Sequence, residues 1–168
     1  VCLGVPKVLE IANRDITDRL GAQGADRICA VRQAFTGAIN TEALLMFPVK
    51  QSLQLVQMMV GDDVPLEQLS EMEQESLAEI GNILLNSVVG SVADMLKIEF
   101  EGSLPFVELG RSVDVLCPDG DFDNLVLSLH INFDIASRKI QGYLVFLLDV
   151  ASGDMLERKL AQFLGALE

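Results

Sequence analysis

The chain has 168 residues, half of them hydrophobic, with 12 Lys and Arg against 25 Asp and Glu, which gives a net charge of −13. This length is enough for one domain with a sizeable core, and the apolar content excludes a disordered chain. The negative charge argues against nucleic-acid binding, which needs a basic face to neutralise phosphates, and favours a partner with basic groups.

Chemistry that depends on several histidines or on paired cysteines is disfavoured. His130 is the only histidine, and Cys2, Cys29 and Cys117 show neither zinc-site nor disulfide spacing. Scattered thiols are typical of a reducing compartment, so a cytoplasmic location is expected. No continuous apolar run is long enough to cross a membrane and no secretory signal opens the chain, so we expect no membrane insertion.

Hydrophobic spacing and turn residues predict the elements of the first part of the chain. They are a strand over Val5–Ile11, a short helix over Arg14–Leu20, a strand pair over Ile28–Thr36 and Glu42–Phe47, and a helix from Pro48 to Val60. Pro65 then begins the longest helical pattern, which runs to about Lys97. Five glutamates fill its N-terminal half, where the helix dipole favours negative charge.

The last part of the chain repeats this order of elements. The expected elements are a strand region over Ile98–Leu116, a turn over 117–124, a strand pair over Leu125–Phe133 and Lys139–Leu148, and a helix over Ser152–Leu164 capped by Gly165. The offset between matching elements is about 99 residues, which indicates a duplicated half-domain rather than a solenoid. The fold predicted is therefore a single α+β domain over 1–168, with pseudo-twofold halves of about 1–62 and 63–168 and a long exposed helix. Since the long helix precedes only the second half, we expect that an upstream helix or domain is missing.

The long helix carries a polar stripe made of Glu75, Glu79, Asn82 and Asn86, which fall within about 60° of one another around its axis. The opposite side is predicted to be the core stripe, made of Leu77, Ile80, Leu84, Val88, Val92 and Met95. Gly81 lies on this apolar side, where it would let another backbone approach. Two asparagines in successive turns run against helix propensity, which suggests function. A solvated polar face, or hydrogen bonds to neighbouring elements, would also explain the stripe.

The segment Ala78-Glu79-Ile80-Gly81-Asn82-Ile83-Leu84, with Pro105 after 22 intervening residues, resembles the CheC/CheX/FliY family of chemotaxis phosphatases, which act on the phosphorylated response regulator CheY. The family pattern is Asp or Ser, three residues, Glu, two residues, Asn, twenty-two residues, Pro. Glu79, Asn82 and Pro105 match it, whereas Glu75 departs from the expected Asp or Ser. The segments Val5–Val8 and Leu44–Pro48 also resemble CheC.

The resemblance implies a phosphatase for the aspartyl phosphate of a CheY-like receiver domain. Asn82 would orient the attacking water, Glu79 would pair with the receiver's lysine, Glu75 and Asn86 would contact the partner, and Pro105 would be structural. The protein would need no cofactor or metal of its own, because the receiver binds the Mg²⁺. A CheD-type deamidase is a further candidate partner, and a homodimer is a candidate assembly. The alternative function is a non-catalytic CheC-like docking or regulatory module, in which Glu75 or the missing helix has reduced catalysis.

Overall fold

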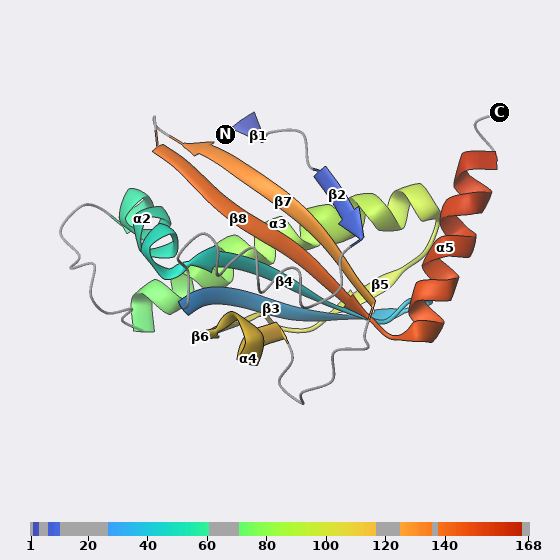
Figure 1. Ribbon diagram of the computed structural model, residues 1–168, viewed down its shortest axis with the longest axis horizontal. Coiled ribbons are helices and arrows are strands. Elements are labelled where there is room, and N and C mark those ends of the chain that lie inside the picture. Colours follow the sequence, from blue (N-terminus) through green and yellow to red (C-terminus); the bar gives the residue numbers. More distant parts are fainter. Residues whose placement is uncertain are drawn as a thin grey trace.

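The computed structural model describes residues 2–3, 7–10, 27–60, 71–116, 125–135 and 138–165, and the side chains of 27–58, 74–116, 140 and 142–165. It has the mixed α+β architecture expected, with helices packed on an antiparallel sheet (Figure 1). The strands are β1 Cys2–Leu3, β2 Lys7–Glu10, β3 Arg27–Gly37, β4 Thr41–Pro48, β5 Phe100–Gly102, β6 Phe106–Arg111, β7 Leu125–Ile135 and β8 Arg138–Leu148. The helices are α2 Val49–Val60, α3 Glu71–Leu96, α4 Ser112–Leu116 and α5 Val150–Gly165.

Two long hairpins form the centre of the sheet. The order is β1-β7-β8-β4-β3-β5, with β2 also pairing with β7 and β6 also pairing with β3. The β3–β4 and β7–β8 hairpins meet where β4 pairs with β8, with Leu44 opposite Val145. Each hairpin is flanked on its outer side by shorter strands, so the order is similar from both edges. This order agrees with a pseudo-twofold arrangement, while the duplication itself stays a prediction.

Both faces of the central strands are buried, because the sheet has helices on both sides. Alternate residues of β3 belong to two clusters: Cys29, Val31 and Phe35 pack toward α2 and α3, while Ile28 and Ala30 pack toward α4. α2 lies beside the N-terminal end of α3, and α5 lies beside its C-terminal end (Figure 1). α3 therefore spans one face of the sheet and is the element that carries the predicted site.

The side of α3 that faces the core differs from the prediction. Leu77, Gly81, Leu85, Val89 and Leu96 are buried, whereas Met95 is 46% exposed and Ile80, Leu84, Val88 and Val92 are half-buried. A Cβ at Gly81 would overlap the side chain of Val31, so the close approach is to a β3 side chain and not to a backbone. The apolar residues cover more than half of the helix circumference, so spacing alone could not choose the centre. Gly81 identifies the centre, because a Cβ there would overlap the side chain of Val31 on β3.

Most described elements lie where the sequence predicted them, with one correction at the end of the strand region predicted over Ile98–Leu116. Ser112–Leu116 forms α4 rather than a strand. The reason lies on the α4 face of the sheet, where the buried Arg32 donates a hydrogen bond to the backbone oxygen of Val115 and pairs with Glu108 at 2.9 Å and with Glu42. The predicted helix at 14–20, the turn at 117–124 and the proposed helix start at Pro65 lie outside the described residues.

α3 is also the one described helix with the length and composition of a membrane span. The stretch Gln74–Leu96 is long and apolar enough to cross a bilayer by length and composition. One such helix is weak evidence, because the core helix of a soluble protein passes the same test. Here the buried side of α3 packs on the sheet through Leu77, Leu85 and Val89.

Candidate functional site

The polar stripe lies along the border between the buried and exposed sides of α3. Glu75, Glu79 and Asn86 are exposed and Asn82 is half-buried. The stripe is therefore beside the core and not opposite to it, which corrects the geometry expected from the sequence. Neither glutamate forms an ion pair within the described part of the chain, so both carboxylates are available to a partner.

Asn82 and Asn86 belong to a cluster of side-chain amides that includes Gln33 of β3. Gln33 is only 2% exposed and faces α3, in a row otherwise made of Cys29, Val31 and Phe35. Its Nε2 donates to the backbone oxygen of Ser103 at 2.8 Å and to Asn82 Oδ1 at 3.4 Å. Sequence reasoning missed Gln33, although a polar residue at a core position of a strand is a signal that could have found it.

Asn86 completes this cluster. Its Nδ2 donates to both the backbone oxygen and Oδ1 of Asn82 at 2.7 Å, and lies 3.4 Å from Gln33 Oε1. A Cβ at Gly102 would lie 3.1 Å from Gln33 Nε2 and 3.4 Å from Asn86 Oδ1, so only a small residue fits there easily. The two asparagines are thus tied to one another and to the sheet, whereas the glutamates are not.

Pro105 lies in an irregular segment of the neighbouring edge of the sheet. Gly102 pairs with Phe35 and Phe106 pairs with Arg32, so three residues of this edge face two residues of β3. This is the count of a β-bulge, a feature that often occurs beside functional sites and that tolerates proline. The bulge directs the carbonyl of Ser103 at Gln33, while the backbone and side chain of Ser103 bond Ala34. Pro105 follows Ser103 by two residues in this bulge, while its structural role stays a prediction.

Exposed apolar side chains border the stripe. Ile83 is 60% exposed and belongs to the turn of α3 that carries Asn82 and Asn86. Leu104, in the bulge, is 89% exposed. Large apolar groups beside a polar stripe are a common composition for a protein-binding surface.

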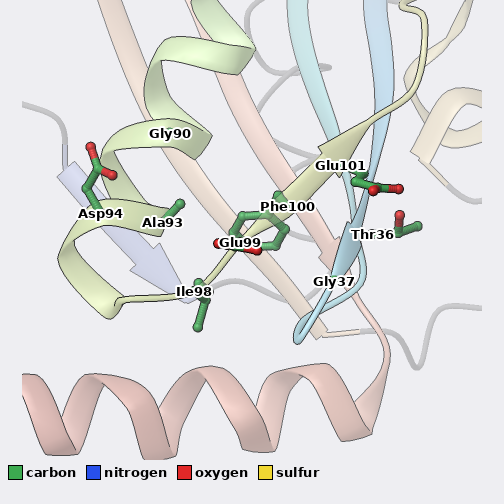
Figure 2. A pocket seen from close by; sticks show the side chains of 9 residues that line it. All are labelled: Thr36, Gly37, Gly90, Ala93, Asp94, Ile98, Glu99, Phe100 and Glu101. Carbon is green, nitrogen blue, oxygen red and sulfur yellow. The ribbon is translucent and has the colours of Figure 1, made fainter.

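A separate hollow lies near the C-terminal end of α3. It has a volume of about 600 Å³ and is lined by Thr36, Gly37, Gly90, Ala93, Asp94, Ile98, Glu99, Phe100 and Glu101 (Figure 2). None of the predicted site residues lines it. Asp94 comes from α3 and Glu101 from β5, on opposite sides of the hollow in Figure 2. Among the described residues, no three His, Cys, Asp or Glu form a group that could hold a metal ion.

Two titratable groups with shifted pKa values lie away from the stripe. Burial raises the pKa of the Cys29 thiol to about 11, an effect reduced by a hydrogen bond with Ser52. Hydrogen bonds from Ser152 lower the pKa of Asp149, whose Oδ1 accepts the Ser152 backbone N–H at 2.6 Å. Asp149 immediately precedes α5 and caps it. Both groups have structural roles.

The sequence of this chain is similar to that of one curated chemotaxis protein. No protein-family model matches it. The chain is 28% identical over 109 residues to the CheY-P phosphatase CheC of Bacillus subtilis, a match that covers 62% of this chain and 51% of CheC. The chain is therefore similar in sequence to CheC over part of its length. It spans about half the length of that curated relative.

Solved structures show the same fold. FliY from Thermotoga maritima matches with a TM-score of 0.72 and 20% identity, covering 97% of this chain and 81% of FliY. FliM from H. pylori, solved in complex with SpeE, matches with a TM-score of 0.67 and 10% identity over 95% and 79% of the two chains. CheX from Borrelia burgdorferi, solved in complex with CheY, BeF3 and Mg²⁺, matches with a TM-score of 0.52 and 14% identity, covering 88% of this chain and 83% of CheX. The chain therefore has the FliY/CheX fold.

Proposed function

We propose that this protein accelerates hydrolysis of the aspartyl phosphate on a CheY-like receiver domain. The observation that carries the proposal is the side-by-side placement of Glu79 and Asn82 on α3, with Asn82 held by the sheet and Glu79 left without an ion pair among the described residues. Homology to a CheY-P phosphatase, and the fold shared with a CheX that was solved on CheY, support this partner.

The reaction needs an in-line water more than a strong base. Water attacks the phosphorus, the P–O bond to the aspartyl carboxyl group breaks, and the products are the free carboxylate and inorganic phosphate. The receiver's Mg²⁺ is part of the substrate and offsets the charge of the phosphoryl group. An amide at Asn82 orients the water without titrating, because it offers both a donor and an acceptor.

Glu79 has a different role in this proposal. Its exposed carboxylate pairs with the lysine of the receiver's phosphorylation site and so fixes α3 against it. Glu75, one turn earlier, adds negative charge on the same side, and Ile83 provides an apolar contact. A cytoplasmic location follows from this partner.

The second candidate is a docking or regulatory module without catalysis. The match to FliM solved with SpeE favours it, because the same fold there binds another protein. The replacement of the family's Asp or Ser by Glu75 also favours it. Both candidates predict binding of a receiver, and only the first predicts faster dephosphorylation.

The test is the rate of phosphate loss from a phosphorylated receiver with Mg²⁺, with and without this protein. Acceleration by wild type and by Asn40→Ala, but not by Asn82→Ala, supports the phosphatase. Asn40 is a suitable control because it is an exposed asparagine in the β3–β4 turn. Binding of the receiver without acceleration would replace the proposal with the docking module.

A further inference from the structure

The amide cluster around Asn82 has a definite direction of hydrogen bonding. Two of its amides are anchored by backbone oxygens, which can only accept: Gln33 Nε2 bonds the oxygen of Ser103 and Asn86 Nδ2 bonds the oxygen of Asn82. Such contacts determine which end of each amide carries the nitrogen. The orientation of Gln33 and Asn86 is therefore fixed by the backbone.

Both amide nitrogens also lie within hydrogen-bond distance of the Asn82 side chain, and Asn86 Nδ2 shares its second proton between Asn82 Oδ1 and the more distant Gln33 Oε1. Gln33 Nε2 and Asn86 Nδ2 lie 3.4 and 2.7 Å from Asn82 Oδ1, so the oxygen of Asn82 accepts from two donors. Its Nδ2 forms no hydrogen bond with any residue that the structure describes. The amide oxygen of Asn82 faces the sheet, and its nitrogen is left for a partner.

We infer that Gln33 is a positioning residue, which fixes the amide of Asn82 so that its N–H₂ group faces the substrate. This inference rests on the proposed function, and it specifies that Asn82 acts on the attacking water as a donor through Nδ2. A water held by this donor keeps its other lone pair for the phosphorus. Rigid placement matters because small displacements of an orienting group reduce the rate strongly.

The burial of Gln33 agrees with this role. A side-chain amide in an apolar row costs free energy unless its polar atoms are bonded, and Gln33 is 2% exposed. Its carbonyl and amino groups find partners on two separate elements, the bulge at Ser103 and the helix at Asn86. Gln33 thereby ties α3 to the edge of the sheet at the turn that carries Asn82.

The test uses Gln33→Met, which keeps the length of the side chain and removes its donors, with Gln54→Met on α2 as the control. The side-chain amide of Asn82 is followed by ¹⁵N relaxation in the free protein. We expect an order parameter near that of rigid backbone, about 0.85, in wild type and in the control, and below about 0.6 in Gln33→Met. Asn86→Ala, at an exposed position, is a second variant that removes the other donor and should loosen the same amide.

Kinetics with a phosphorylated receiver provide the second measurement. Gln33→Met should lower kcat by about tenfold or more while KM stays within about twofold, because the binding surface is unchanged. A mobile Asn82 amide in wild type, or an unchanged kcat in a folded Gln33→Met whose Asn82 amide is mobile, would overturn the inference. A third outcome separates the two proposals. If the Asn82 amide is rigid in wild type and mobile in Gln33→Met, but wild type does not accelerate dephosphorylation, the proposed function fails and the positioning of Asn82 by Gln33 stands.

Discussion

Gly81 and Gly90 form a matched pair on α3 that tests how the helix is placed on the sheet. A Cβ at Gly81 would lie 2.9 Å from Val31 Cγ2 and closer still to Cγ1, whereas a Cβ at Gly90 would meet nothing within 4 Å. Both positions are inside the helix, so alanine gains about 0.8–1.0 kcal/mol of helix propensity at each. Only Gly81→Ala must also push α3 away from β3.

The expected difference between the two variants is the cost of overpacking, about 1–3 kcal/mol, because the propensity gain cancels. Gly90→Ala should be stabilised by about 1 kcal/mol. Gly81→Ala should be less stable than Gly90→Ala by the overpacking cost, and since it moves Asn82 away from Gln33, its kcat should also fall. Urea unfolding measures both stabilities, and an unchanged m-value shows that the same surface is exposed.

Val31→Ala tests whether the methyl group of Gly81→Ala clashes with the side chain of Val31. Shortening Val31 makes room for the new methyl group, so the double variant should be more stable than the sum of the single effects predicts. A coupling energy of about 0.5–3 kcal/mol is expected for residues in contact. If Gly81→Ala is as stable as Gly90→Ala, or if the coupling with Val31 is zero, α3 does not rest on β3 at this point.

Three further predictions concern single groups. Glu79→Lys should weaken receiver binding by about tenfold or more. Glu157→Lys, the same charge change at an exposed site on α5, should leave binding unchanged. Equal affinities of the two variants in titration calorimetry would remove the proposed role of Glu79. Because the pKa of Cys29 is raised to about 11 from 9.0, its contribution to stability is complete below pH 9 and is lost as the pH rises toward 11. Cys29→Ala should therefore lose less stability than wild type over that range, by up to roughly 2–3 kcal/mol, and parallel alkaline melting curves would contradict this. Because the pKa of Asp149 is lowered from its ordinary value of 3.8, the ionised carboxylate stabilises the fold at pH values above 3.8, and this contribution is lost as the pH falls below 3.8. Asp149→Asn should keep the helix cap and lose this acid dependence in thermal melts.

The strands and helices were largely predictable because their patterns are local. The β3–β4 and β7–β8 hairpins, α2 and α5 appear within a few residues of the expected bounds. α4 was not expected, because its five residues are too few to show helical spacing and Arg32 bonds Val115 there from a distant strand. The core side of α3 was misjudged because its apolar residues are distributed around the helix, so a tertiary contact at Gly81 decides it.

The candidate site was predictable only in part. The spacing of Glu79 and Asn82 showed that they share one side of a helix, and the resemblance to CheC suggested their roles. The spacing could not show that Gln33, distant in sequence, bonds both Asn82 and Ser103, because that depends on the register of β3 with the bulged edge. Asn86 was predicted to contact the partner, and the structure adds that its amide nitrogen bonds Asn82, while the partner contact stays a prediction.

The rate of a single turnover at saturating protein tests the role of Asn82, because it separates chemistry from binding. A phosphorylated receiver is mixed with excess wild type, Asn82→Ala or Asn40→Ala in the presence of Mg²⁺, and the loss of phosphate is followed. We predict that wild type and Asn40→Ala accelerate the first-order loss, and that Asn82→Ala binds the receiver but is slower by about 10²-fold or more. A saturated complex in which Asn82→Ala is as fast as wild type would show that Asn82 takes no part in the chemistry.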